Sequence, residues 1–237
     1  MIQTEGIFVG GSAISAPIIG EDFNWTGGDG TYQVLDDGGG NWRIKFLSSG
    51  TFTPLKNMVI DVFLVGGGGG AGSSYCGEGG AGYTTTVRSV VLTANTAYSI
   101  VVGAAGTNGN PSSAGGETTA FTASAAGGKN TSNGTSSSKR PGGAGGSGGA
   151  GYVSPVATTT GGTDGGDGTS SATTGGKGQG TTTREFGEAD GTLYASGGGS
   201  NLTATVSNSG NGGSNGITSI EPADGIVVIR QHKEVAA

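Results

Sequence analysis

The chain has 237 residues, of which 55 are glycine, and only 12% of its residues are charged, with a formal net charge of −6. Glycine at this frequency is well above ordinary usage, yet it falls short of the one residue in three that a collagen triple helix demands, so collagen is excluded. Its 11 Lys and Arg residues stand singly or as the pair Lys139-Arg140. Because nucleic-acid binding needs a basic patch, nucleic acid is not an expected partner.

The N-terminal stretch and the hydropathy predict a protein that does not insert into membranes. Residues 1–22 have no positively charged start and carry Glu5, which does not fit a secretory signal peptide. The longest apolar run, MVIDVFLV at 58–65, is interrupted by Asp61 and is far shorter than the roughly 20 residues of a membrane-spanning helix. Cys76 is the single cysteine, so no intrachain disulfide can form.

The first part of the chain carries the two-residue alternation of half-buried β-strands. TYQVLDDGGGNWRIKF, at 31–46, predicts a hairpin that closes on Asp37-Gly38. Its second strand places three apolar side chains on one face: Trp42, Ile44 and Phe46. Both tryptophans, Trp25 and Trp42, lie within residues 1–47. We expect this segment to form an N-terminal attachment or β segment, and residues 48–237 to form a glycine-rich domain.

Further strands are predicted across the glycine-rich domain, at 51–65, 83–102, 117–123 and 225–231. No window shows the apolar spacing of an amphipathic helix, and glycine recurs too often for helices to nucleate. The predicted fold class is therefore all-β, with essentially no α-helix.

Blocks of glycine separate these strands, and we expect them to form ordered rods at 66–82 and 142–216. The run GGAGGSGGAG at 142–151 repeats every three residues, which is the period of a polyproline II helix. Such a helix has no internal hydrogen bonds, so its N–H and C=O groups need partners in neighbouring rods, which glycine allows to approach closely. The glycines predicted to build rods are Gly66, Gly67, Gly68, Gly69, Gly70, Gly142, Gly143, Gly145, Gly146, Gly148 and Gly149. The intervening Ala144, Ser147 and Ala150 are expected to face outward.

A flexible linker is the alternative interpretation of the same composition. Glycine in place of alanine costs about 0.5–1 kcal/mol per position in regular structure. For 55 glycines this amounts to some tens of kcal/mol, which exceeds an ordinary net stability of about 5–15 kcal/mol. The blocks are therefore either disordered or built in a geometry that requires glycine. The three-residue period favours the second possibility.

Catalytic motifs are weak in this sequence, and we expect a protein without enzymatic activity, cofactor or metal. His232, the single histidine, lies in a charged tail far along the chain from Cys76, which does not favour a Cys/His nucleophile pair. GEGGAG at 77–82 fits GxGxxG, but no helix is predicted after it to hold a pyrophosphate. One imperfect GGTDGGDGT at 161–169 is too little for a stacked calcium-binding repeat.

Several segments in order carry a family resemblance: SSGTFTPLKNMVIDVFLVGGGGGAG, GGAGYTTT, AYSIVVGAAG, EFGEADGTLYASGGG and GIVVIR. They resemble the glycine-rich domain of bacteriophage and prophage tail-fibre proteins and tip adhesins. More distantly, the order of a strand, the poly-glycine run, the AYSIVVG strand, GGETTAF and AAGG is similar to the glycine-rich extracellular region of anaplastic-lymphoma-kinase-type receptors. The resemblance implies a bundle of polyglycine II helices beside a jelly-roll-like β-sandwich. In the phage adhesins such a bundle tips the fibre, and its connecting loops bind the host.

From this resemblance we expect a virion protein, made in the host cytoplasm without a signal peptide. Its implied partners are other tail-fibre proteins and a bacterial surface receptor, either a glycan or an outer surface protein. Whether the chain is a homotrimer or a monomer stays open. The alternative is a structural component without receptor binding, such as a capsid decoration, head fibre or fibre spacer. The connectors expected to bind the receptor, or else to seal the bundle, contain Tyr75, Tyr152, Val153, Val156, Leu202 and Val206.

Overall fold

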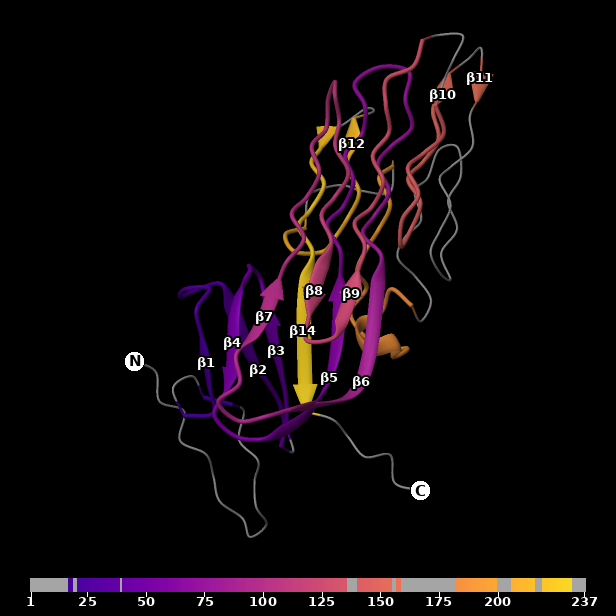
Figure 1. The fold of residues 1–237 in the computed structure, drawn as a ribbon. Coiled ribbons are helices and arrows are strands. Elements are labelled where there is room, and N and C mark those ends of the chain that lie inside the picture. Colours follow the sequence, from indigo (N-terminus) through magenta and orange to yellow (C-terminus); the bar gives the residue numbers. More distant parts are fainter. Residues whose placement is uncertain are drawn as a thin grey trace.

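The molecule is elongated, with a β-sandwich at one end and a bundle of extended segments at the other (Figure 1). The structure, a computed structural model, describes residues 17–18, 21–38, 40–135, 140–154, 157–158, 182–199, 206–215 and 219–231. No helix within these ranges is long and apolar enough to cross a membrane.

Two antiparallel five-stranded sheets form the sandwich. The first sheet has the order β1 (Phe23–Trp25), β4 (Gly50–Pro54), β7 (Tyr98–Val101), β8 (Thr118–Ala120), β9 (Ala123–Ala125). The second has the order β2 (Tyr32–Gly38), β3 (Asn41–Phe46), β14 (Ile226–Gln231), β5 (Met58–Val65), β6 (Thr84–Leu92). Two short strand pairs, β10 (Val153–Ser154) with β11 (Ala157–Thr158) and β12 (Ser214–Asn215) with β13 (Ser219–Ile220), and one 3₁₀ turn, η1 (Glu185–Gly187), complete the elements of the described ranges. The all-β prediction is confirmed.

The core of the sandwich lies between the two sheets and is rich in aromatic side chains. The predicted alternation in β3 holds, because Trp42, Ile44 and Phe46 are all buried in this core. The Phe46 and Phe52 rings meet edge to face across the sheets, with centroids 5.6 Å apart.

Residues 1–47 do not form a segment separate from the sandwich. β1, β2 and β3 are hydrogen-bonded into the two sheets, and the side chains of Trp25 and Trp42 are buried in the shared core. The expected division at residue 47 therefore cuts through one hydrophobic core. The physical reason is burial: large aromatic side chains gain more stability in a core than on a surface.

Several predicted strands are divided where the chain changes sheets or turns back. The predicted strand 51–65 is split into β4 and β5, which belong to different sheets. The prediction 83–102 likewise covers β6 and β7. The prediction 117–123 is a hairpin of β8 and β9, with Phe121 in the left-handed region at its turn.

The β2–β3 hairpin forms as predicted but closes later. Gly38 pairs with Asn41, and the register shifts between Asp36 and Gly38, so Asp37 is the extra residue of a β-bulge. Asp37 therefore lies beside the turn instead of in it. Its carboxylate instead accepts a hydrogen bond from Arg43 at 2.7 Å.

Beyond the sandwich, extended segments run side by side to the far end of the molecule (Figure 1). We call them rods and number them along the chain: rod 1 (66–72), rod 2 (77–83), rod 3 (103–108), rod 4 (113–117), rod 5 (126–131), rod 6 (141–146), rod 7 (148–152), rod 8 (195–199), rod 9 (209–214) and rod 10 (221–225). β5 continues into rod 1 and β9 into rod 5, while rod 2 leads into β6 and rod 10 into β14.

The hydrogen bonds of rod 1 repeat every three residues. The amides of Gly66 and Gly69 both donate to rod 2, those of Gly67 and Gly70 both donate to rod 4, and that of Gly68 donates to rod 10. Carbonyl groups of rod 1 accept from rods 5 and 9, and that of Gly68 accepts from rod 3. Within the described residues, rod 1 is thus enclosed by rods 2, 3, 4, 5, 9 and 10. This is the packing of extended helices with three residues per turn.

Rod 2 is enclosed in the same way, by rods 1, 5, 6, 7, 8 and 9 among the described segments. These two interior rods explain the need for glycine. A Cβ on any of Gly66 to Gly70 would lie less than 3.0 Å from a backbone atom of a neighbouring rod. Because that neighbour is backbone, it has no side chain that could move aside.

The bundle also joins the two sheets. In the sandwich, side chains hold facing sheets about 10 Å apart. Where glycine follows β5, rod 1 comes within hydrogen-bonding distance of rod 4, which leads to β8 in the other sheet: Gly67 N–H donates to Gly116 O at 3.0 Å. At this junction the buried Thr118 hydroxyl donates to Val65 O at 2.7 Å. The bundle therefore continues both sheets, as glycine-rich segments that approach one another more closely than the sheets do.

Candidate functional site

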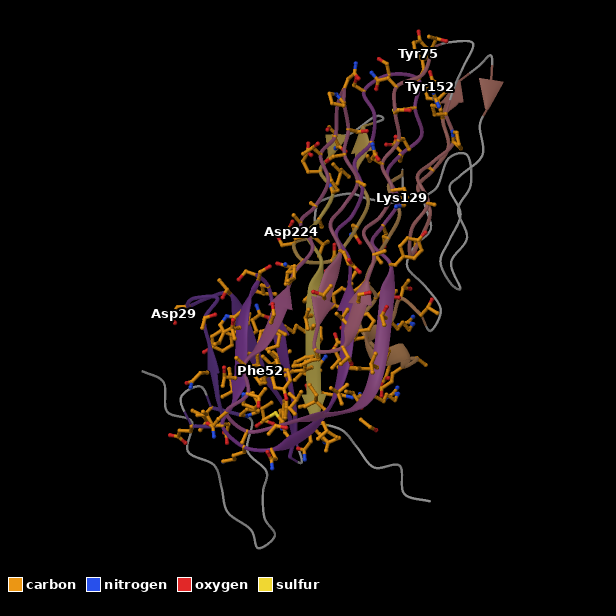
Figure 2. All side chains as sticks on the ribbon, viewed as in Figure 1. Asp29, Phe52, Tyr75, Lys129, Tyr152 and Asp224 are labelled. Carbon is orange, nitrogen blue, oxygen red and sulfur yellow. The ribbon has the colours of Figure 1, made fainter. Side chains whose placement is uncertain are left out.

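The end of the bundle farthest from the sandwich, which we call the tip, is the first candidate site. Its described parts are the loops 72–77, 108–112, 131–135 and 140–141, the end of rod 7, and the β12–β13 pair, where Asn108 Nδ2 donates to Ile220 O at 2.9 Å. Figure 2 shows Tyr75 and Tyr152 there, at the opposite end of the molecule from Phe52 in the sandwich core.

Polar side chains hold the tip in one conformation. Where rod 1 ends, its amides lose their neighbours in the bundle, and side chains of adjoining loops replace them. Ala71 N–H donates to Asn108 Oδ1 at 2.8 Å, and Ser73 N–H donates to Asn133 Oδ1 at 2.7 Å. Gly72 N–H donates to the Thr131 hydroxyl at 3.0 Å. The backbone at the tip is thereby satisfied and fixed.

Tyr75 is the most prominent side chain of the tip. Its backbone is in the left-handed region, with φ of 49°, and its carbonyl accepts a hydrogen bond from Arg140 N–H at 3.4 Å. Its ring packs against that of Tyr152, with centroids 5.8 Å apart and planes inclined by 61°. Even so, 43% of Tyr75 remains exposed. The ring is therefore held in place while it faces solvent.

The other residues expected to bind a receptor do not all lie at the tip. Val153 begins β10, next to Tyr152. Val206, which is 57% exposed, lies near the sandwich, because Asn208 beside it donates to the carbonyls of Leu47 and Gly225. The reason is direction: rod 9 runs from the sandwich to the tip, so the connector before it ends at the sandwich. Val156 and Leu202 lie outside the described residues.

The GGX run at 142–151 folds back on itself, contrary to the expectation of a single rod with outward-facing X residues. Rods 6 and 7 form a hairpin in which Gly149 N–H donates to Gly143 O at 2.8 Å, with a bend at Gly146 and Ser147. Ser147 is fully buried at 0% exposure and Ala150 is also buried, whereas Ala144 is half-buried. The bend presses Ser147 into the bundle, and rod 7 then returns Tyr152 to the tip.

A second cluster lies on the outer face of the second sheet, and none of the site residues predicted from the sequence belongs to it. Residues 182–195, which we call the strap, lie across β5 and β14. The buried rings of Phe186 and Tyr194 pack on Phe63, with centroids 6.1 and 5.5 Å from its ring. The outward side chains of the sheet, including Val228, are thereby covered.

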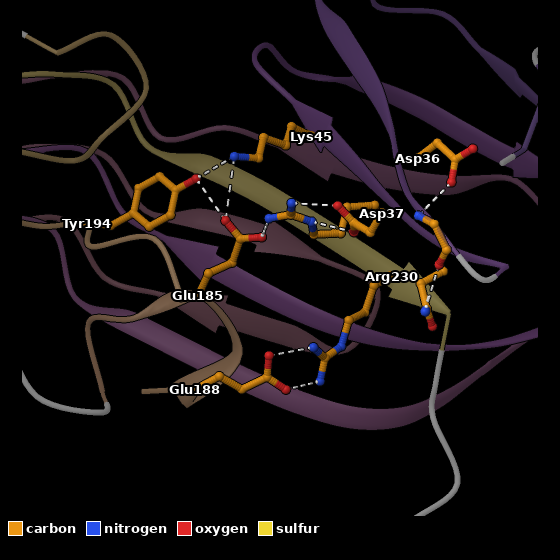
Figure 3. A network of polar contacts seen from close by, with 10 residues as sticks. Asp36, Asp37, Lys45, Glu185, Glu188, Tyr194 and Arg230 are labelled. Atoms are coloured by element: carbon orange, nitrogen blue, oxygen red, sulfur yellow. Dashed lines mark hydrogen bonds and ion pairs between the residues drawn. The ribbon is translucent and has the colours of Figure 1, made fainter. Parts of the chain in front are cut away.

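Buried ion pairs fasten the strap to the sheet (Figure 3). Glu185, which is 2% exposed, accepts from Arg43 Nη1 at 2.6 Å and lies 3.5 Å from Lys45 Nζ. The Tyr194 hydroxyl donates to Glu185 Oε2 at 3.2 Å. Burial and the neighbouring Glu185 carboxylate raise the pKa of the Tyr194 hydroxyl above its ordinary value. Tyr194 therefore keeps its proton and acts as a hydrogen-bond donor to Glu185.

Asp61 is the centre of the second half of this network. It is 1% exposed and accepts hydrogen bonds from Arg88 Nη1 at 3.1 Å, Arg230 Nε at 3.2 Å and Ser89 N–H at 3.2 Å. A β-bulge in β6 opposite Asp61 brings Ser89 into reach. Arg230 also forms an ion pair with Glu188, with Nη2 2.7 Å from Oε1. A charged residue inside an otherwise apolar strand was the only sequence signal for this cluster.

The strap network fits a structural clamp better than a reactive site. A hollow of about 290 Å³ beside it is lined by side chains that include Asp37, Arg43, Glu185, Glu188 and Arg230. These carboxylates and guanidiniums bond one another. Among the described residues, no three His, Cys, Asp or Glu side chains gather as a metal site.

Comparison with protein families places most of this chain in one family. The model of a glycine-rich domain matches residues 47–230. The chain belongs to this glycine-rich domain family. The match covers the sandwich from the end of β3 to β14, together with the whole bundle. A search of curated proteins finds no match.

Proposed function

We propose that this glycine-rich protein is a non-enzymatic phage virion protein, a tail-fibre or tail-tip adhesin that attaches to the bacterial surface through the tip of its rod bundle. The observation that carries the proposal is the fixed and exposed Tyr75 ring, paired with Tyr152 at the end of the bundle. An aromatic side chain that is already held in place loses little entropy on binding. Loops that carry binding residues on a rigid scaffold are a common arrangement.

The end of the sandwich at which the chain enters and leaves also supports this proposal. β1 enters the sandwich and β14 leaves it at the end opposite the tip, as the pairing of β1 with β4 and of β14 with β5 requires (Figure 1). One end of the molecule is thus available to other tail-fibre proteins while the tip faces outward. In this proposal the protein works on the virion, needs no cofactor, and binds neither nucleic acid nor the membrane interior.

Binding of the purified, fluorescently labelled chain to a panel of intact bacteria tests the proposal. We expect saturable binding to some strains and a loss of binding when Tyr75 and Tyr152 are both replaced by Ser. Val91→Ser is the matched control, because Val91 is an exposed apolar residue in the sandwich. Circular dichroism spectra and melting curves like those of the parent chain show that each variant is folded. Absence of binding to every strain would favour a capsid decoration, head fibre or fibre spacer instead.

A further inference from the structure

We infer that the ligand of the tip is an uncharged saccharide of the bacterial surface, with a sugar ring stacked on Tyr75. This inference rests on the proposed function and narrows it from any surface receptor to one chemical class. Three properties of the described tip support it: its low charge, its few exposed apolar side chains, and the contacts that hold Tyr75 in place.

The described tip surface carries hydroxyl and amide groups and hardly any charge. Arg140 is the single charged residue in loops 72–77, 108–112, 131–135 and 140–141, and one exposed carboxylate, Glu221, directly follows the β12–β13 pair. The exposed polar residues of these loops are Ser73, Ser74, Asn110, Ser132 and Thr135. Hydroxyls both donate and accept hydrogen bonds, as do primary amides through their two ends, which suits the hydroxyl groups of a sugar. A strongly acidic glycan would call for a cluster of cations.

The described tip exposes one large apolar side chain, and that side chain is aromatic. The exposed large apolar residues of the described chain are Ile18, Val59, Tyr75, Val91, Val101, Leu193 and Val206. Of these, Tyr75 alone lies at the tip. A stable protein interface buries about 800 Å² on each partner around an apolar centre of several side chains. One exposed ring surrounded by hydroxyls instead matches a pyranose, which presents one C–H face and a rim of hydroxyls.

The tip is also prepared for a small ligand. Tyr75 packs against Tyr152, and its carbonyl is tied to Arg140 N–H. Its loop is held from the other side, since Gly134 N–H donates to Ser74 O at 3.0 Å. Binding a sugar therefore requires little ordering of the protein, which raises the affinity that one stacking contact can provide.

The test uses the full chain and the bacterial strains that it binds. Cells are treated either with periodate, which cleaves the vicinal diols of sugars, or with a broad protease, and binding is then measured. We expect periodate to abolish binding and protease to leave it unchanged. Binding that survives periodate but not protease would overturn the saccharide inference while leaving the adhesin proposal intact. If the untreated panel is not bound at all, the adhesin proposal itself fails, and the inference fails with it.

Point variants test the role of the ring. Tyr75→Phe keeps the stacking surface and should bind the same cells within about threefold, whereas Tyr75→Ser should weaken binding about tenfold or more. Arg140→Gln should bind nearly as the parent chain does, because the expected ligand is uncharged. Strong loss with Arg140→Gln and full retention with Tyr75→Ser would overturn the inference. The melting temperature of each variant shows whether a loss of binding reflects unfolding of the tip.

Discussion

Replacing Gly68 by Ala should destabilise the whole protein, because Gly68 lies at the centre of the bundle. A Cβ at this position would lie less than 3.0 Å from the backbone carbonyl of Asn211 in rod 9. The two rods would have to separate. That movement would strain the hydrogen bonds from Gly68 N–H to Ala223 O at 2.9 Å and from Gly106 N–H to Gly68 O at 2.8 Å.

The expected magnitude follows from these contacts. Overpacking of a closed site costs about 1–3 kcal/mol, and two weakened hydrogen bonds cost about 1 kcal/mol each. The lower entropy of alanine in the unfolded chain offsets up to about 1 kcal/mol. We therefore expect Gly68→Ala to lower the free energy of unfolding by about 2–4 kcal/mol, a large part of an ordinary total.

Equilibrium unfolding in urea measures this change, with tryptophan fluorescence reporting on the sandwich core and circular dichroism on the whole chain. Gly116→Ala is the matched control, because its Cβ would lie 3.0 Å from its nearest neighbour, Ala104 N, on a half-buried rod at the edge of the bundle. We expect the control to change stability by less than about 1 kcal/mol. A Gly68→Ala protein as stable as the parent would refute the close packing of rod 1.

Three further substitutions or reactions test other parts of the structure. Asp61→Ala should lower the free energy of unfolding by about 3 kcal/mol in urea titrations, since it leaves the buried Arg230 without one of its carboxylates; an unchanged midpoint would contradict the clamp. Ser147→Thr should destabilise by about 1–3 kcal/mol because Ser147 is fully buried, whereas Ala144→Ser on the half-buried position should be neutral, and equal melting temperatures would contradict the hairpin. Burial raises the pKa of the Cys76 thiol, so less thiolate is present at pH 8 and iodoacetamide should react more slowly with folded than with urea-unfolded protein; equal rates would argue against a folded tip.

The rods that the sequence could predict are those with a run or a regular repeat of glycine. The three-residue period of the GGX run and the poly-glycine run after β5 indicated extended helices that bond to their neighbours. Rods 3, 4, 5 and 10 were not predicted, although they have the same hydrogen bonding. These rods lie at or near the edge of the bundle, where one face of the rod is open to solvent and side chains are tolerated. A segment such as EPADG at 221–225 therefore carries no compositional mark of a rod.

The fold of the GGX run and of the strap depended on contacts that a local pattern does not contain. A period of three is the same whether Gly142 to Gly151 runs straight or bends at Ser147. At the bend, Gly146 and Ser147 exchange hydrogen bonds with Ala81 of rod 2, a contact that the local pattern does not contain. The strap lies against β5 and β14 because Phe186 and Tyr194 find apolar partners there. Asp61 interrupts an apolar strand, but the local pattern does not indicate its partner Arg230, which lies far away along the chain.

Amide hydrogen exchange of Gly66 to Gly70 tests most directly whether glycine runs form rigid rods that hold the tip. If rod 1 is enclosed on all sides, these amides open only when the protein unfolds. Their exchange should then be slowed by about a thousandfold or more relative to an unstructured peptide, as for the core strand β5. Exchange at the rate of an unstructured peptide, beside a protected β5, would contradict the account and show that the glycine run is a flexible linker.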